Sequence, residues 1–220
     1  MNNTTKLLPS CATCAIAVLL LATSDGLTAT SGADRAPDAP RADRSQTTYR
    51  GGSITPPLAK PQFTLSDTSG APFDFGVETQ GYVTLLFFGY THCPDECPTH
   101  MAAIAMSLRQ VPEQVRNQVK VVFVTADPAR DSAAVLRAWL DHFDKRFIGL
   151  TGNAASIEAA QQAASIPKAS KIVLGNKPYQ VAHAAFVLAY TKDNVARFLY
   201  PAGMTSVDWA HDLPLLVKEA

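Results

Sequence analysis

An apolar run from Tyr82 to Phe88, bounded on each side by a glycine, constrains the fold of this chain more than any other segment. Such a run, without alternating polar residues, predicts a strand that is buried on both faces. It ends in a loop that carries Cys93 and Cys97. Open α/β sheets place their sites where the carboxyl end of a strand leads into a helix. If a helix begins near Pro94, the i, i+4 spacing puts both sulfurs on one of its faces.

Further strands and helices are expected to alternate along the chain. The sequence patterns predict a hairpin over residues 63–75 with a turn at 67–70, a helix from about 98 to 111, a strand at 119–125, a helix at 132–143, a short strand at 147–150, a helix capped by Asn153 that runs to about 164, a hairpin of strands 184–190 and 195–200, and a last helix from about 206 to 218. Residues 167–180 have no clear period and are expected to be an irregular excursion. This order predicts an α/β fold, with a mixed central sheet, helices on both faces and an N-terminal hairpin.

The N-terminal 33 residues have the composition of a targeting segment. Lys6 precedes an uncharged run from Leu7 to Ser24, and small residues follow it. This pattern predicts an export signal, and its length also suits an N-terminal membrane anchor. Residues 34–56 are rich in Ala, Pro, Ser and Thr and predict a flexible tether, which leaves 57–220 as the folded domain. We expect an exported protein, either anchored at the periplasmic face of the inner membrane or soluble in the periplasm.

Charge and cysteine content limit the possible functions. The formal net charge is zero and no basic block occurs, so neither nucleic acid nor an acidic membrane surface is predicted as a partner. Cys11 and Cys14 fall within the targeting segment, where they are interpreted as small apolar residues. The folded domain therefore has two cysteines, Cys93 and Cys97. In an oxidising compartment such a pair can form an ordinary structural disulfide.

His183 is the third candidate for chemistry at this loop. It precedes the strand 184–190, which is expected to lie antiparallel beside the central strand and to start near the cysteines. Two thiolates and one imidazole form a donor set for copper in either oxidation state, or for zinc with an added water. The same spacing also fits a disulfide or redox pair beside a hydrogen-bonded core histidine. From the residues alone, the choice between a metal site and a thiol pair stays open.

Four segments resemble those of one known family. The sequence FGYTHCPDECP at Phe88–Pro98 resembles the signature of the Sco/SenC family, copper-binding assembly factors of cytochrome c oxidase. Asp127–Asp131, Arg146–Gly152 and Val181–Phe186 resemble further family segments in the same order, and the likeness extends over residues 63–217. The resemblance implies a thioredoxin-like fold with an N-terminal membrane anchor or signal.

The resemblance also implies a site and a partner. Carried over to this sequence, it makes Cys93, Cys97 and His183 the ligands of copper, as Cu(I), Cu(II) or both. The implied partner is the CuA-bearing subunit of cytochrome c oxidase, with other periplasmic copper chaperones as further partners. The family often has an acid before its histidine and a serine after it, whereas Ala182 and Ala184 stand here. These two side chains offer no polar group to orient the imidazole.

Several functions fit this site. The first is a copper metallochaperone for CuA assembly. The second is a thiol–disulfide oxidoreductase that keeps the CuA cysteines reduced, with Cys93 and Cys97 as the redox-active pair. Against it, three residues separate the cysteines where thioredoxins have two, and no proline precedes His183. A redox or copper sensor also fits the site, as does a structural disulfide in a binding module.

The remaining polar residues near the motifs have weaker signals. His92 is interpreted as a solvated loop histidine, and His100, one turn beyond Cys97, as an exposed helix histidine rather than a fourth donor. The residues Asp127, Arg130 and Asp131 suit a patch that docks a partner or supports the metal ligands from behind, or a loop-fixing role in which Asp131 caps the following helix.

Overall fold

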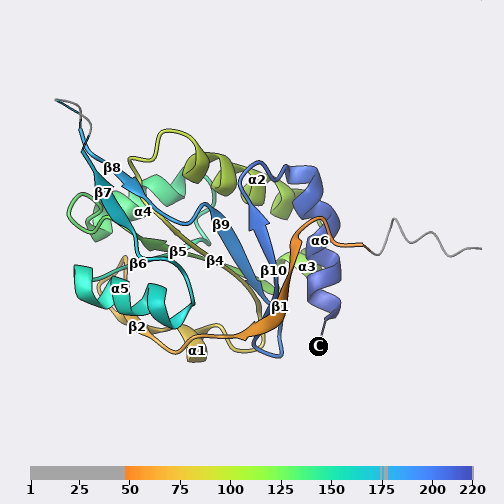
Figure 1. Cartoon of the computed structure of the whole chain (residues 1–220). Helices are drawn as coiled ribbons and strands as arrows, with labels where there is room; N and C mark the ends of the chain where they lie inside the picture. Colours follow the sequence, from red (N-terminus) through yellow and green to blue (C-terminus); the bar gives the residue numbers. More distant parts are fainter. Residues whose placement is uncertain (1–47, 174, 176–177, 220) are drawn as a thin grey trace, which may run out of the picture. The chain divides into compact units, whose positions relative to one another are not determined.

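The central strand of the sheet is β4 (Val83–Gly89), where the apolar run predicts it. Its side chains alternate between two cores. Leu85 and Phe87 pack into one cluster, Leu86 and Phe88 pack into the other, and all four are fully buried. The prediction of a strand that is buried on both faces is confirmed, because helices cover both sides of the sheet at this strand (Figure 1).

The computed structural model describes residues 48–219 except 174, 176 and 177. The predicted export signal or anchor (1–33) and residues 34–47 of the predicted tether lie outside the described residues. None of the helices in the described part of the chain combines the length and the hydropathy that crossing a bilayer requires.

The described residues form a large mixed sheet and a small separate ribbon. The large sheet has the strand order β1-β10-β9-β4-β5-β6-β2-β3. The pairs β4–β5 and β5–β6 are parallel, and all its other pairs are antiparallel. The strands β7 and β8 pair only with each other. The remaining strands are β1 (Gly52–Ala59), β2 (Thr64–Asp67), β3 (Pro72–Asp74), β5 (Val119–Thr125), β6 (Ile148–Thr151), β7 (Ser170–Ile172), β8 (Gln180–Ala182), β9 (Phe186–Tyr190) and β10 (Val195–Pro201).

Helices cover both faces of the large sheet, as predicted (Figure 1). Side chains of α2, α4 and α6 belong to the core that contains Phe87, and side chains of α1 and α5 belong to the core that contains Phe88. Asn153 caps α5 by accepting a hydrogen bond from the N–H of Ser156, as expected of a helix that begins there. The helices are α1 (Phe75–Glu78), α2 (Glu96–Gln110), α3 (Glu113–Arg116), α4 (Ala133–Asp141), α5 (Ala154–Ala163) and α6 (Ser206–Lys218).

The first strand, β1, overlaps the predicted tether. Residues 52–56, which we expected to be flexible, belong to the sheet and pair antiparallel with β10. The pairing is irregular between Ser53 and Leu58, on either side of Pro56 and Pro57. Proline is tolerated in a strand at the edge of a sheet because one side of that strand needs no ladder hydrogen bonds. The folded domain therefore begins before residue 57.

Two other segments differ from the sequence-based expectation. The excursion at 167–180 contains β7 and leads into β8, so it forms a two-stranded ribbon rather than an irregular loop. The helix α2 begins at Glu96, and Cys93 lies in the turn that precedes it rather than on its first turn. The N-terminal hairpin β2–β3 agrees with the prediction, since the Asp67 carboxylate closes its turn by accepting from the N–H groups of Ser69 and Ala71.

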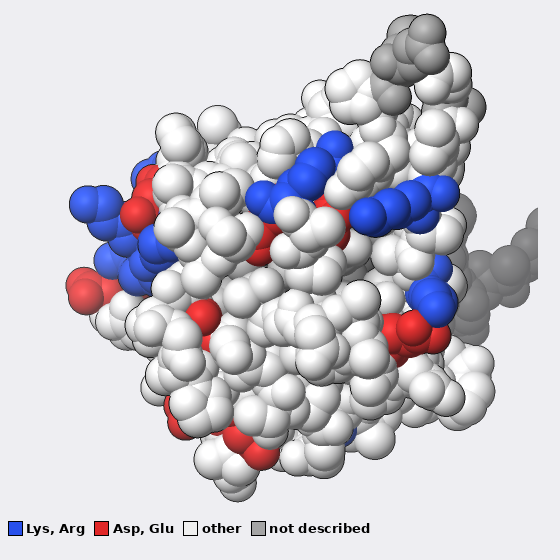
Figure 2. Space-filling model, turned by 90° about the vertical axis from the view of Figure 1, so that its left-hand side faces the viewer, with Lys and Arg blue, Asp and Glu red and all other residues white. Residues whose placement is uncertain are grey.

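The face of the molecule in Figure 2 carries charges of both signs. Lys and Arg side chains there lie beside Asp and Glu side chains, with uncharged areas between the groups. Among the described residues, Arg137 and Asp141 of α4 form one ion pair, and Lys168, beyond the end of α5, forms another with Glu158 of that helix. These exposed pairs are screened by solvent and add little stability. The charges on this face are therefore mixed rather than of a single sign.

Candidate metal site

The two cysteines lie at the carboxyl end of β4. The backbone leaves the strand through a turn in which the N–H of Cys93 donates to the carbonyl of Tyr90, 3.2 Å away. Cys93 is half-buried in this turn, whereas Cys97 is fully buried in the first turn of α2. The condition for a helical i, i+4 arrangement of the two cysteines, a helix that begins near Pro94, is therefore not met, because α2 begins only at Glu96. The turn nevertheless directs both sulfurs to one place, beside the N-terminus of a helix, where a thiolate is favoured.

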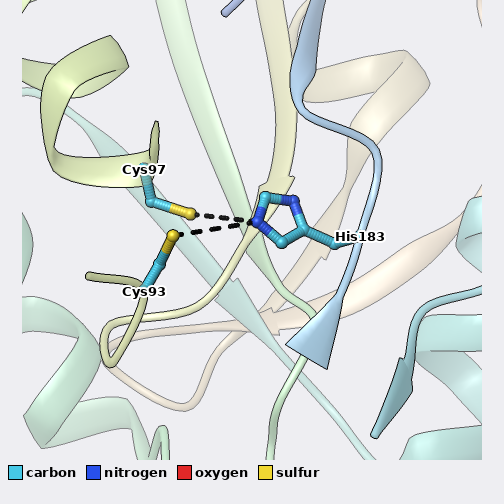
Figure 3. Close-up of side chains that lie close together, drawn as sticks. All are labelled: Cys93, Cys97 and His183. Atoms are coloured by element: carbon cyan, nitrogen blue, oxygen red, sulfur yellow. Dashed lines mark hydrogen bonds between the residues drawn. The ribbon is translucent and has the colours of Figure 1, made fainter. Parts of the chain in front are cut away.

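The pairing of β9 with β4 brings His183 to the same place. β9 runs antiparallel to β4, with Leu188 opposite Leu86, so the residues that precede β9 lie at the carboxyl end of β4. The imidazole Nε2 of His183 lies 3.4 Å from Cys97 Sγ and 4.0 Å from Cys93 Sγ (Figure 3). The predicted neighbourhood of these three side chains is confirmed.

The three donor atoms are placed to share one ion. They all lie within 4.8 Å of one another, and among the described residues no other group of His, Cys, Asp or Glu meets this criterion. Thiolates and imidazoles bind a metal at about 2.0–2.3 Å, so donors up to about 4.5 Å apart can hold one ion without a large rearrangement. Two thiolates with one imidazole suit copper in either oxidation state, and also zinc with an added water.

The imidazole is oriented by the backbone rather than by a side chain. Nδ1 of His183 lies 3.1 Å from the carbonyl oxygen of Ala184, which can only accept, so Nδ1 carries the donated proton. In the neutral ring this leaves Nε2 without a proton, so its lone pair, on the side of the two sulfurs, is available to a metal ion. The carbonyl thus supplies the orientation that the alanines at 182 and 184 cannot supply with their side chains.

The thiols ionise very differently. The neighbouring Cys97 thiol lowers the pKa of Cys93 from 9.0 to about 3, against the effect of burial and with further help from His183 and the backbone N–H groups at 95 and 97. Burial, together with the negative charge on Cys93, raises the pKa of Cys97 above its ordinary value. Burial alone would lower the pKa of His183, but its hydrogen bonds with Cys93 and the Ala184 carbonyl outweigh this and raise it. The metal-free pair therefore carries one negative charge, and a metal must displace the Cys97 proton.

Aromatic rings and a glycine form the wall of the site. The rings of Phe87 and Tyr90 meet the imidazole of His183 edge to face, at centroid distances of 5.8 and 5.6 Å. At the end of β4, a Cβ on Gly89 would lie only 2.8 Å from Cys97 Sγ. A side chain at position 89 would therefore displace the sulfur, and glycine lets the strand approach it closely.

The two other histidines near the cysteines are not part of the cluster. The side chain of His92 is 51% exposed and lies 3.0 Å from Thr91 Oγ1, as expected of a solvated loop histidine. The prediction of an exposed His100 is wrong. His100 is 2% exposed, because its face of α2 packs on the sheet beside Phe87, and its Nε2 lies 3.4 Å from the carbonyl of Ala185.

The two carboxylates of the charged loop after β5 are buried. Asp127 and Asp131 are 1% and 0% exposed, so their side chains are not available to a docking partner. Asp131 does not cap α4 either, because Ser132 accepts the hydrogen bond from the N–H of Val135. The loop-fixing role is the one that agrees with the structure. No sequence pattern singled out Tyr179, whose hydroxyl donates to Asp127.

Comparison with known proteins identifies the family. The SCO1/SenC family model matches residues 52–218. The chain belongs to the SCO1/SenC family. The resemblance that rested on the segment Phe88–Pro98 is confirmed, and the SCO1/SenC match begins at the first residue of β1, in agreement with a folded domain that starts before residue 57.

Individual SCO1/SenC proteins are similar over most of the fold. The mitochondrial SCO2 protein of Saccharomyces cerevisiae is 30% identical over 148 residues, which are 64% of this chain and 46% of that protein. The structure of apo Sco1 from Thermus thermophilus is 29% identical with a TM-score of 0.69, covering 78% of this chain and 98% of that one. The structure of Bradyrhizobium japonicum ScoI with copper bound is 29% identical with a TM-score of 0.65, covering 73% and 100%. The thioredoxin-like fold is confirmed. The chain spans about half the length of the curated relatives it matches.

Proposed function

We propose that this protein is a copper metallochaperone. It holds one copper ion on Cys93, Cys97 and His183 and delivers it to the CuA site of cytochrome c oxidase during assembly of that enzyme. The observation that carries the proposal is the convergence of two thiols and one imidazole within 4.8 Å. Membership of the SCO1/SenC family and the similarity to a copper-bound ScoI structure support copper as the ion.

The geometry of the site suits the release of its cargo. Cys93 is half-buried and already ionised, so an incoming thiolate of the acceptor can reach a metal that this residue holds. Cys97 is fully buried and, together with His183, keeps the ion in place until the exchange begins. With only three ligands from the chain, copper retains coordination space for a donor of the partner. The proposed acceptor is the CuA-bearing subunit, with other periplasmic copper chaperones as further partners.

The N-terminal region completes the proposal. Residues 1–33 act as an export signal or membrane anchor, and a tether that ends before β1 connects them to the thioredoxin-like domain. Export places the metal site on the periplasmic face of the inner membrane, either anchored or soluble in the periplasm. A membrane-impermeant thiol reagent applied to intact cells tests this location. Labelling of Cys93 supports it, and labelling only after lysis contradicts it.

A second function has one specific observation in its favour. The low pKa of Cys93 and its partial exposure are typical of an attacking thiol in a thiol–disulfide oxidoreductase. In that reaction the Cys93 thiolate attacks a CuA-site disulfide of the acceptor and forms a mixed disulfide. Cys97 then displaces the second acceptor thiol, so the acceptor is reduced and Cys93 and Cys97 become a disulfide.

A transfer experiment separates the two functions. The full chain, loaded with one equivalent of Cu(I), is mixed with a reduced, metal-free CuA-bearing subunit, and copper is measured on each protein after separation. In parallel, the metal-free reduced chain is mixed with the oxidised acceptor, and acceptor thiols are counted. Copper on the acceptor supports the chaperone. New acceptor thiols without any copper transfer contradict it and support the oxidoreductase.

The matched controls for this experiment are two histidine variants. His183→Ala is expected to hold copper more weakly, on its two thiolates alone, and to carry less copper to the acceptor. His142→Ala replaces an exposed histidine at the end of α4, outside the metal cluster, and is expected to transfer copper like the parent. Equal transfer by both variants would exclude His183 from the site.

A further inference from the structure

One buried carboxylate holds the loop that carries the cysteines. Asp131 is fully buried, and its oxygens accept hydrogen bonds from the backbone N–H of Thr91 at 3.0 Å and from the Thr91 hydroxyl at 2.6 Å. A buried charge is tolerated only when such bonds satisfy it, and bonds to a charged acceptor are strong. Thr91 precedes Cys93 by two residues. Asp131 therefore fixes the backbone from which the Cys93 side chain projects.

A second buried carboxylate of the same loop holds the segment that carries the histidine. The Tyr179 hydroxyl donates to the two oxygens of Asp127 at 2.9 and 3.1 Å. Arg130 pairs with Asp127, donates to the carbonyl of Tyr179 at 3.1 Å, and places its guanidinium 3.8 Å from the centre of the Tyr179 ring. Tyr179 directly precedes β8, and His183 directly follows it. The loop thus anchors the start of the strand that leads to the imidazole.

The hydroxyl of Thr125 links Asp131 to Asp127. It donates to Asp131 at 2.7 Å and accepts from the backbone N–H of Asp127 at 3.0 Å. Thr125 is the last residue of β5, which pairs in parallel with β4, the strand that leads to the cysteines. The two carboxylates are therefore fixed to each other and to the central sheet.

The ribbon that carries His183 needs such an anchor. In the described part of the chain β7 and β8 pair only with each other, and an isolated two-stranded ribbon is at best marginally stable in water. The side chains of Ala182 and Ala184 make no polar contact that could hold the imidazole, which takes its orientation from the Ala184 carbonyl. The position of the ring therefore depends on the backbone of the ribbon.

We propose that Asp127, Arg130 and Asp131 are positioning residues of the metal site. Asp131 acts through Thr91 on the cysteine loop, and Asp127 with Arg130 acts through Tyr179 on His183. Together they hold the imidazole at its distance from the two sulfurs. This inference rests on the proposed copper function in one respect only, which is that a misplaced His183 or cysteine weakens copper binding. The alignment itself is a property of the metal-free protein.

The variant Tyr179→Phe tests, with the smallest possible change, the contact between Asp127 and the segment that carries His183. It removes the hydroxyl that bonds Asp127 and keeps the ring beneath Arg130. We expect copper to bind roughly 10-fold more weakly, since loss of a group that orients a ligand typically costs 10–100-fold in affinity. In the His183→Ala background the same substitution should have no further effect, because its route to the metal is gone. Unchanged affinity in Tyr179→Phe, or an equal loss in both backgrounds, would overturn the proposal.

Another variant tests the contact of Asp131 with the cysteine loop, and its effect on copper affinity should not depend on His183. Thr91→Val keeps the size of the side chain and removes the 2.6 Å bond to Asp131. Copper should bind more weakly in this variant, and in contrast to Tyr179→Phe the loss should persist in the His183→Ala background, because it acts through the cysteines. If the loss disappeared in that background, the assignment of Asp131 to the cysteine loop would be wrong. Asp131→Asn provides a second variant with the same expected pattern.

A readout without copper separates this inference from the proposed function. In the reduced, metal-free full chain, nitrogen NMR of the imidazoles reports the surroundings of each histidine. Tyr179→Phe should shift or broaden the signals of His183 and leave those of His142 unchanged, and Tyr82→Phe, at the other end of β4, should change neither. Unchanged His183 signals would overturn the positioning role. If Tyr179→Phe shifts or broadens the His183 signals but the parent chain binds no copper, the proposed function is refuted and the positioning role stands.

Discussion

The Sγ of Cys97 lies 3.4 Å from Nε2 of His183, although 86 residues separate them in the sequence. Two independent features produce this relationship. The antiparallel pairing of β9 with β4, beside the parallel pair β4–β5, places the carboxyl end of β4 and the start of β9 at the same end of the sheet. The carbonyl of Ala184 then turns the imidazole so that Nε2 faces the sulfurs. The site therefore depends on the pairing of the central strands and on one backbone carbonyl.

Cys93 should react as a thiolate even in acid. Its pKa of about 3 lies below pH 5, so the deprotonated form dominates at every pH above that value. The rate of alkylation by iodoacetamide should therefore stay nearly constant between pH 5 and 8. An ordinary cysteine would lose roughly 1,000-fold in rate over this range, because only the thiolate reacts. Alkylation is followed by mass spectrometry of the metal-free chain.

The Cys97→Ala variant is the control for this pH profile. It removes the largest cause of the lowered pKa, so the alkylation rate of Cys93 should become pH-dependent between pH 5 and 8. The thiolate fraction of an unperturbed thiol rises about tenfold per pH unit in this range. An alkylation rate of Cys93 in the parent chain that rises in the same way would contradict its lowered pKa.

Gly89→Ala should damage both the fold and the site. The added Cβ would lie 2.8 Å from Cys97 Sγ and 2.9 Å from the ring of Phe123. Overpacking of this kind costs about 1–3 kcal/mol in unfolding free energy, which urea titration measures. Copper affinity should also fall, because the sulfur must move. Gly52→Ala is the matched control, since its Cβ would meet no atom closer than 3.8 Å. Equal effects of the two substitutions would contradict the close approach at Gly89.

Asp212 should be needed to hold the start of the folded domain. This fully buried carboxylate accepts from the backbone N–H groups of Arg50 and Gly51 at 2.8 and 3.1 Å and from the Tyr200 hydroxyl at 2.9 Å. Asp212→Ala leaves these donors unpaired, at about 1–3 kcal/mol for each buried group, so we expect a loss of about 3 kcal/mol in unfolding free energy. Asp141→Ala, which breaks an exposed ion pair, should cost less than about 1 kcal/mol. Similar losses in both variants would show that the contact with residues 50 and 51 is unimportant.

Oxidation should abolish copper binding reversibly. Cys93 and Cys97 are free thiols, and their sulfurs lie within 4.8 Å of each other. Diamide takes two electrons from the pair, is itself reduced to a hydrazine, and leaves a disulfide that has no thiolate to offer a metal. The treated chain should carry no copper after gel filtration, and dithiothreitol should restore binding. Copper retained by the fully oxidised chain would show that the thiols are not its ligands.

The sequence predicts best where burial is strongest. The strand β4 is apolar on both faces, so neither its conformation nor its central place in the sheet depends on detail elsewhere in the chain. The approach of His183 to the cysteines follows from the antiparallel pairing of β9 with this strand. The choice of copper over a disulfide or zinc did not follow from spacing, and required the family resemblance of the segment Phe88–Pro98.

The sequence predicts least where a distant partner decides the outcome. Residues 52–56 contain Ser, Thr and Pro and have the composition of a tether, but β10 supplies ladder partners that make them an edge strand. His100 is buried because α2 turns its face to Phe87, which a lone histidine on a helix does not reveal. Tyr179 acquires a role only through Asp127, 52 residues earlier.

X-ray absorption of the chain loaded with one equivalent of Cu(I) tests the central claim most directly. We expect two sulfur donors and one imidazole nitrogen, with the imidazole signal lost in His183→Ala and retained in His142→Ala. An unchanged imidazole signal in His183→Ala, or a parent chain that binds no copper when Cys93 and Cys97 are reduced, would contradict the proposed copper site.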